Sequence, residues 1–219
     1  MDKLTPMMQQ YMEIKERNAD YILLYRLGDF YEMFFEDAKL ASTELDLVLT
    51  GRDCGLDERA PMCGVPYHSV DAYIARLVQK GYKVAVCEQT EDPALAKGLV
   101  KREIVRLITP GTVTDDGMLE GGKNNYLAAV LPDGAGFAVA WTDASTGEIC
   151  AIHLEEAGRV EDELGRLSPR EVLTVQAFPL PQGLQNFCRR QLGALLTAVG
   201  KEIEELTAAA IGRYGKDDL

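Results

Sequence analysis

The chain has 219 residues, of which 47% are hydrophobic and 26% charged, as is usual for a folded globular protein with two modest cores. Its formal net charge of −12 argues against a general nucleic-acid binder with a basic surface. Both halves are acidic, at −5 for residues 1–115 and −7 for residues 116–219, so any contact with DNA must use a small local patch. No apolar run approaches the roughly 20 residues of a membrane helix. The N-terminus lacks the layout of a signal peptide. A cytoplasmic protein without a membrane partner is expected.

The five cysteines contain no Cys-x-x-Cys pair, and the two histidines lie far apart in the sequence. Neither a metal site nor a disulfide framework is therefore predicted, and the thiols are expected to be reduced and mostly buried.

The first predicted elements are a helix and a strand. Thr5 as N-cap and Pro6 at the first helical position open a helix that runs to about Asn18. Residues 21–27 are aliphatic and aromatic and indicate a buried strand. Gly28 ends the strand, and Asp29 is predicted to cap a second helix. The apolar residues of that second helix recur at three- and four-residue steps: Phe30, Met33, Phe34, Ala38, Ala41 and Leu45.

Phe30 and Glu32 therefore fall in the first turn of the predicted second helix, and two interpretations of them are open. In the first, Asp29 and Glu32 form a capping box and Phe30 belongs to the core. In the second, Phe30 is an exposed wedge with Glu32 as a polar group beside it. An apolar wedge in a DNA minor groove unstacks one base step at a cost of about a few kcal/mol. That cost is lowest where pairing is already faulty. The pattern alone does not choose between them.

The rest of the first half predicts helices packed on a small mixed sheet. Residues 46–50 indicate a strand, 51–60 a polar loop containing Arg52, and 61–67 a Gly- and Pro-punctuated segment containing Met62. A helix capped by Ser69 stops at Gly81, and strands follow at 82–87 and 101–109. The loop between these last two strands and the later strand carry four basic residues that form either a local patch or a solvated strand face: Lys97, Lys101, Arg102 and Arg106.

Residues 113–123 are rich in glycine and acidic residues and indicate a linker. Beyond it, strands at 125–131, 136–143 and 148–154 are joined by turns and predict an antiparallel meander. A helix at 160–167 and a strand at 171–175 follow, and residues 184–199 and 201–213 have helical periodicity.

Five segments resemble the bacterial MutS family of DNA mismatch recognition proteins. They run collinearly through the first half of the chain: Leu4–Tyr11, Tyr25–Phe34, Pro61–His68, Val84–Gln89 and Val105–Thr112. The resemblance implies a mixed-sheet α/β mismatch-recognition domain over residues 1–112. It also implies a linker over 113–123 and a ribonuclease-H-like α/β connector domain, either complete or truncated, over 124–219.

The resemblance also implies site residues and partners. Phe30 would stack on a mispaired base of double-stranded DNA, and Glu32 would hydrogen-bond to that base. Met62 corresponds to a family position near the mismatch. From the sequence itself, Arg52 is either a phosphate contact or a solvated loop arginine, and Lys97 and Arg102 are candidate DNA contacts in the local basic patch. The connector domain would dock the partner MutL. ATP and magnesium would belong to other segments of the family, because this chain has no phosphate-binding Gly-x-x-x-x-Gly-Lys-Ser/Thr run. No cofactor, resident metal or enzymatic activity is expected in the chain itself. It is expected to be a monomer, whereas the full-length parent would be a homodimer.

Two other functions remain open. The acidic second half suits a pure protein-interaction module. A metal-dependent nuclease is the other candidate, because Asp143 ends a strand where ribonuclease-H-like nucleases hold a metal ligand. Such chemistry needs several converging carboxylates, and the strand at 171–175 offers none at its carboxyl end. A turn-capping role for Asp143, Ser145 and Thr146 is the simpler interpretation.

Overall fold

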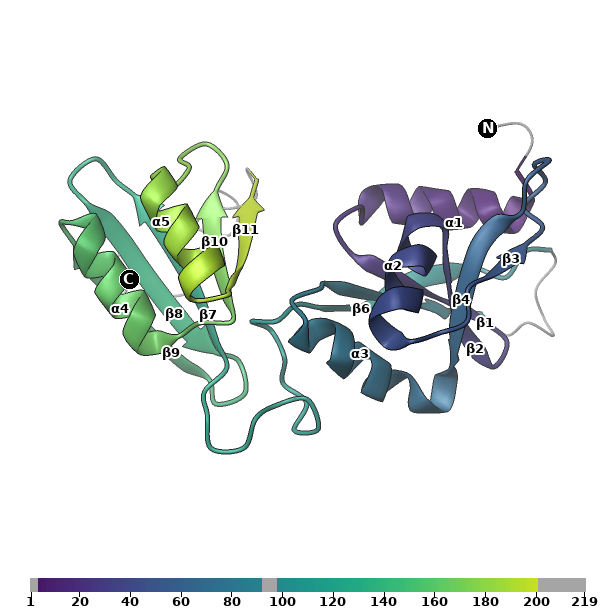
Figure 1. Cartoon of the computed structure of the whole chain (residues 1–219), viewed down its shortest axis with the longest axis horizontal. Helices are drawn as coiled ribbons and strands as arrows, with labels where there is room; N and C mark the ends of the chain where they lie inside the picture. Colours follow the sequence, from purple (N-terminus) through teal and green to yellow (C-terminus); the bar gives the residue numbers. More distant parts are fainter. Residues whose placement is uncertain (1–3, 92–97, 201–219) are drawn as a thin grey trace. The chain divides into compact units, whose positions relative to one another are not determined.

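The computed structural model describes residues 4–91 and 98–200, and the chain divides into two compact units, Met1–Pro110 and Gly111–Leu219 (Figure 1). Each unit is a helix-covered mixed sheet, which confirms the predicted pair of α/β folds. Among the described residues, no helix is long and apolar enough to span a bilayer.

Unit 1 is built on a six-stranded sheet in the order β3-β4-β2-β1-β5-β6. Neighbouring strands run antiparallel except β1 and β5, which are parallel. The strands are β1 (Ile22–Leu27), β2 (Phe30–Phe34), β3 (Thr50–Arg52), β4 (Ala60–Pro66), β5 (Val84–Gln89) and β6 (Arg102–Ile108).

The helices of unit 1 cover both faces of this sheet. Helix α1 (Pro6–Arg17) contributes Met8 and Tyr11 to a core that includes Tyr25 and Phe34. On the opposite face, helix α2 (Phe35–Leu45) lies against β4, where the Cys63 thiol donates to the Ala38 carbonyl at 3.4 Å. The short 3-10 turn η1 (Tyr67–Ser69) leads into helix α3 (Val70–Gln79), which contacts β4 and β5. Figure 1 shows α2 and α3 together in front of the sheet.

The predicted strand-to-helix corner at Gly28 is wrong. Gly28 and Asp29 form a two-residue hairpin connection between β1 and β2, with Leu27 paired to Phe30 and a positive φ of 56° at Gly28. Phe30 and Glu32 therefore lie on a strand, and Asp29 caps no helix. The chain enters α2 only after Phe34, at Phe35, which has a positive φ of 53°.

Two further predictions in unit 1 need correction. Residues 46–49 form no strand, because Asp46 ends α2 in the left-handed conformation with φ 57°. The strand begins instead at Thr50, and Arg52 is its last residue rather than part of a loop. The punctuated segment with Met62 is the seven-residue strand β4, which pairs with both β2 and β3.

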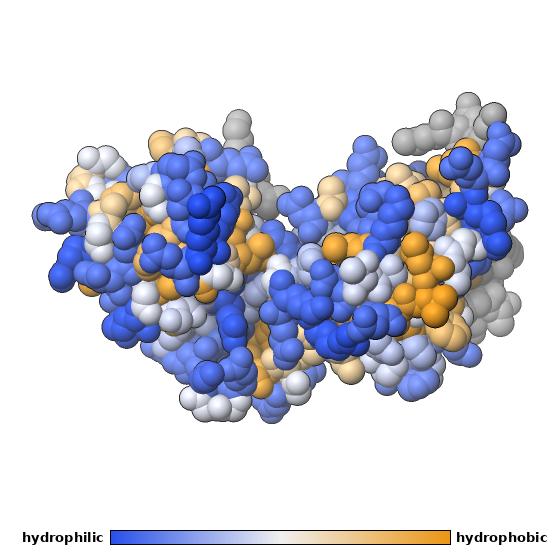
Figure 2. Space-filling model, viewed as in Figure 1, coloured by the Kyte–Doolittle hydropathy of each residue, from blue (hydrophilic) through white to orange (hydrophobic). Residues whose placement is uncertain are grey.

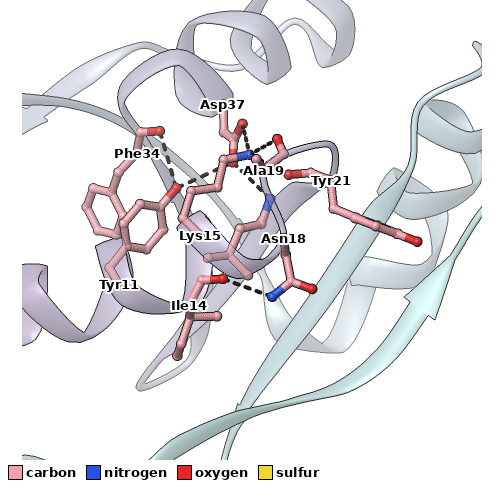
Figure 3. A network of polar contacts seen from close by, with 9 residues as sticks. Tyr11, Ile14, Lys15, Asn18, Ala19, Tyr21, Phe34 and Asp37 are labelled. Carbon is pink, nitrogen blue, oxygen red and sulfur yellow. Dashed lines mark hydrogen bonds and ion pairs between the residues drawn. The ribbon is translucent and has the colours of Figure 1, made fainter. Parts of the chain in front are cut away.

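A buried polar network ties α1 to β1 and to the start of α2 (Figure 3). Asp37 accepts from Lys15 Nζ at 2.9 Å, from the Leu23 backbone N–H at 3.0 Å and from the Tyr11 hydroxyl at 3.4 Å. Lys15 also donates to the carbonyls of Ala19 and Tyr21. Burial, and then the charge of Asp37, raise the pKa of Tyr11 far above its ordinary value. These bonds satisfy the polar groups at a junction that the core would otherwise leave unpaired.

Unit 2 contains a five-stranded sheet in the order β11-β10-β7-β8-β9. The antiparallel meander is confirmed, and β10 runs parallel to both β7 and β11. Unit 2 is therefore a mixed α/β sheet, as the resemblance implied for the second domain. Its strands are β7 (Tyr126–Pro132), β8 (Phe137–Asp143), β9 (Glu148–Leu154), β10 (Glu171–Val175) and β11 (Leu195–Val199).

Helices cover one face of the unit 2 sheet, where Val130, Val139, Val160, Leu164 and Leu184 form the core. They are α4 (Ala157–Leu167), α5 (Gln182–Asn186) and the π-helical turn η2 (Phe187–Gln191). The predicted helix over 184–199 is wrong in its second half. The helical segment ends before Gly193, which has φ 66°, and β11 follows. The predicted helix at 201–213 lies outside the described residues.

The exposed apolar side chains form small patches separated by hydrophilic residues on the face seen in Figure 2. All five cysteines are free thiols, and four of them are buried: Cys54, Cys63, Cys87 and Cys188. The expectation that the thiols are mostly buried is therefore confirmed.

Candidate nucleic-acid interface

The hairpin of β1 and β2 presents Phe30 at its tip. As the first residue of β2, Phe30 has 47% of its surface exposed, and it belongs to neither described core. Alternation along the strand turns Phe30, Glu32 and Phe34 to the same face of the sheet. Phe34 is fully buried against Tyr11, with ring centroids 5.0 Å apart. The face thus passes from core at Phe34 to solvent at Phe30 within five residues.

Glu32 lies between these two extremes. It pairs with Tyr25 on β1 and with Gly64 on β4. Its Oε2 accepts a hydrogen bond from Arg52 Nη1 at 2.7 Å. The capping-box interpretation of Glu32 is wrong, because a residue inside a strand has no helix N-terminus to cap.

The remaining predicted DNA contacts are dispersed. Met62 is half-buried on β4, opposite Phe34 and Thr50, and packs against the core. Lys97 lies outside the described residues. Arg102 is only 7% exposed.

Arg102 is a structural residue, so its prediction as a surface phosphate contact needs correction. Its Nε donates to the Arg26 carbonyl at 2.8 Å, and its Nη1 donates to Val100 O and Gln10 Oε1. The guanidinium also lies 4.9 Å from the centre of the Tyr25 ring. Nε and Nη1 of Arg102 are therefore bound to partners within unit 1, which argues against a surface phosphate contact.

The other two basic residues of the predicted patch are paired with acids. Lys101 forms an ion pair with Glu103 at 2.6 Å, and Arg106 forms one with Asp71 at 3.1 Å. Acidic neighbours therefore compensate the positive charge of β6, which agrees better with a solvated strand face than with a basic patch.

Sequence reasoning missed a polar cluster that supports the hairpin tip. Arg26 Nε donates to the Gly28 carbonyl at 2.6 Å, and its guanidinium stacks 4.1 Å from the Tyr67 ring centre. Arg26 also lies 3.4 Å from Glu88, which accepts from the Tyr31 hydroxyl. The Tyr67 N–H donates to the Asp29 carbonyl at 2.9 Å. The signal available in the sequence was the two-residue Gly-Asp connection, which indicates a hairpin.

In unit 2, the turn that follows β8 binds one oxygen of Asp143, and the residue before β7 binds the other. Oδ1 accepts from the Ser145 N–H and hydroxyl at 2.9 and 2.6 Å, and Oδ2 accepts from the Asn125 N–H at 2.9 Å. Burial alone would raise the pKa of Asp143, but these hydrogen bonds outweigh it and lower the pKa. The contacts favour the turn-capping interpretation.

The nearest buried acid, Glu171, is on the other side of the sheet from Asp143. Asp143 pairs with Tyr126, and Glu171 pairs with the next residue, Leu127, so the two carboxylates face opposite ways. Within residues 4–91 and 98–200, no group of three or more His, Cys, Asp or Glu residues could hold a metal ion.

Comparison with known proteins identifies the class to which this chain belongs. Its members are multidomain proteins with two successive N-terminal α/β domains. The family model of MutS domain I matches residues 5–117, and that of MutS domain II matches residues 125–208. The chain belongs to the MutS family.

Curated relatives agree with this assignment. The DNA mismatch repair protein MutS of Acetivibrio thermocellus is 48% identical over 99% of this chain and 26% of its own length. The proteins of the same name from Ruminiclostridium cellulolyticum and Caldicellulosiruptor bescii are 58% and 59% identical over 79% of this chain and 20% of theirs. The chain thus spans about a fifth to a quarter of the length of these relatives.

Proposed function

We propose that this chain recognises mismatched double-stranded DNA in mismatch repair, with Phe30 as an aromatic wedge in the minor groove and Glu32 as its polar companion. The observation that carries the proposal is the exposure of Phe30 at a hairpin tip, on the same sheet face as Glu32 and two residues from it. A phenylalanine with this exposure is available to a ligand, and the strand beneath it is anchored in the core through Phe34.

The energetics favour faulty base pairs. Inserting a ring between stacked bases costs about a few kcal/mol, and a mispaired base has already lost part of that stability. Stacking of the ring on the base returns roughly 1–3 kcal/mol. The balance is therefore unfavourable on a fully paired duplex and favourable at a mismatch. Glu32 adds a hydrogen bond to the exposed edge of the base.

The local charge sets a limit on affinity. Arg102 is buried and Lys101 and Arg106 are paired with acids, so these three cations of β6 and its start are poorly available for phosphates. Most of the affinity in a full-length MutS protein would then come from other domains.

Unit 2, which is net acidic over residues 116–219, would act as a connector that docks MutL. The full-length protein would be a dimer and would use ATP and magnesium in other domains.

The test is a chimera in which this chain replaces the matching N-terminal region of the Acetivibrio thermocellus relative. Fluorescence anisotropy compares G·T and single-base-loop duplexes with homoduplex for the parent chimera and for Phe30→Ala. We expect Phe30→Ala to abolish discrimination while the melting temperature stays unchanged. The matched control is Phe178→Ala, which removes a phenylalanine that is 58% exposed in unit 2 and should have no effect. Retained discrimination in Phe30→Ala would refute the proposal.

A further inference from the structure

The Glu32–Arg52 ion pair extends the candidate site to a third strand. Arg52 ends β3 and Glu32 is in the middle of β2, and β4 lies between these strands. By register, Glu32 pairs with Gly64 and Arg52 pairs with Ala60, so both side chains project on one face and meet above β4. The Glu32 side chain is largely buried, whereas that of Arg52 is more exposed.

The strand between them leaves room for this contact. A Cβ on Gly64 would lie 3.4 Å from Glu32 Cγ and 3.3 Å from the Tyr31 carbonyl oxygen, which is a tight fit. The glycine therefore frees the space directly beside the Glu32 side chain.

The ion pair occupies only one oxygen of the carboxylate. Oε2 accepts from Arg52, whereas Oε1 has no hydrogen-bond partner among residues 4–91 and 98–200. A carboxylate held by one oxygen keeps a fixed direction for the other, and a pre-oriented acceptor loses less entropy on binding a ligand. The Glu32 side chain is on the face that carries Phe30.

We propose that Arg52 is a specificity-determining positioning residue: it holds the Glu32 carboxylate by Oε2 and directs Oε1 toward the base beside Phe30. This assignment rests on the proposed function and replaces the role of Arg52 as a phosphate contact. The two roles differ in what they predict. A phosphate contact weakens binding to every duplex alike, whereas a positioning residue affects only the complex in which Glu32 is used.

The experiment is a double-mutant cycle in the same chimera, with Arg52→Gln, Glu32→Gln and the double variant. Kd is measured for G·T duplex and homoduplex over a series of salt concentrations. We expect Arg52→Gln to weaken mismatch binding about tenfold, the effect of one good hydrogen bond to a base. Homoduplex affinity and its salt dependence should be unchanged. In the Glu32→Gln background, Arg52→Gln should have no further effect, because its partner is already altered.

Two results would overturn the assignment. One is equal weakening on both duplexes with a salt slope shallower by about 0.9, as expected for one lost phosphate contact. The other is additivity of the two substitutions on mismatch affinity. The matched control is Arg170→Gln, which breaks a 2.7 Å ion pair with Glu120 in unit 2 and should leave both affinities unchanged.

The cycle also separates this assignment from the proposed function. If Phe30→Ala and Glu32→Gln abolish discrimination but Arg52→Gln does not, only the role of Arg52 is refuted. If all three variants discriminate normally, mismatch recognition by this surface is refuted as well. Melting temperatures of all variants show whether an affinity change reflects unfolding.

Discussion

Lys15 on α1 and Asp37 on α2 form an ion pair of 2.9 Å in a largely buried setting. The same carboxylate also accepts from the backbone of β1, so one side chain links three elements of unit 1. Removing one member of a buried ion pair leaves the other charge buried without a partner. The free-energy cost of that unpaired charge exceeds the net stabilisation that the pair provides.

We therefore predict that Asp37→Asn destabilises the chain by about 3 kcal/mol, because Lys15 loses its counter-ion in a buried site. Urea denaturation followed by circular dichroism measures the change. Glu36→Gln is the neighbouring control, since its ion pair with Lys39 is exposed and should have little effect. Equal small effects of both substitutions would contradict the structural role of the network.

Two phenylalanines on one face of β2 should differ sharply in their effect on stability. Phe34→Ala removes a fully buried ring and should cost about 3–5 kcal/mol. Phe30→Ala removes an exposed ring and should cost below about 0.5 kcal/mol. The denaturant midpoints of the two variants measure these two losses of stability. A large loss of stability in Phe30→Ala would return Phe30 to the core and remove the basis of the wedge.

Stability should decline at alkaline pH because of buried phenols. Burial, then the hydrogen bond and charge of Glu88, raise the pKa of Tyr31 to about 12, and burial raises that of Tyr25 to about 12. An unfolded tyrosine releases its proton near pH 10, so between pH 10 and about 12 the unfolded state binds fewer protons than the folded state. The contribution of these two phenols to the free energy of unfolding is therefore fully present below pH 10, and it is lost as the pH rises through this window. Denaturation across pH 9–12 should show a shallower decline in Tyr31→Phe than in the parent, and equal slopes would contradict the prediction.

The cysteines should separate into one reactive thiol and four protected ones. Burial raises the pKa of Cys63 and Cys188 to about 11 and that of Cys87 to about 12, and Cys54 is also buried. Only Cys150 is partly exposed. A disulfide reagent at pH 8 should therefore titrate one thiol rapidly in the native chain and all five in guanidinium. Cys150→Ser should abolish the fast phase, and a remaining fast thiol would refute the assignment.

The isolated chain should bind DNA weakly, because its net charge is −12 and the exposed cations of β6, Lys101 and Arg106, are paired with acids. We expect no binding to homoduplex below about 1 µM at roughly 0.15 M salt, and a monomeric mass in solution. Anisotropy and sedimentation equilibrium measure these properties. Sub-micromolar affinity for homoduplex would show that a cationic surface has been overlooked.

Sequence periodicity predicted most elements correctly but failed at the hairpin of β1 and β2. Met33 and Phe34 are both buried, so the inside–outside alternation of β2 disappears after Glu32. The apolar residues of β2 and α2 together then recur at three- and four-residue steps, which is the pattern expected of one long helix. The Gly-Asp pair was the better local signal, because two-residue connections with glycine first are typical of hairpins.

The second error, at β11, has a similar origin. Leu195–Val199 is a short apolar run, which fits a buried helix segment as well as a strand. Its pairing with β10 is a long-range contact that no local pattern reveals. The interpretation of Arg102 failed for the same reason, since its partner Gln10 is 92 residues away in the sequence.

The position of Phe30 and Glu32 on a strand limits how this segment can change in evolution. Side chains on a strand alternate with a period of two, so inserting or deleting one residue within β2 would move Glu32 or Phe30 to the opposite face. That face is packed against α2 and α3, where a carboxylate would be buried without a partner. Length variation in this lineage should therefore be absent from β2 and should concentrate in the segment between β3 and β4.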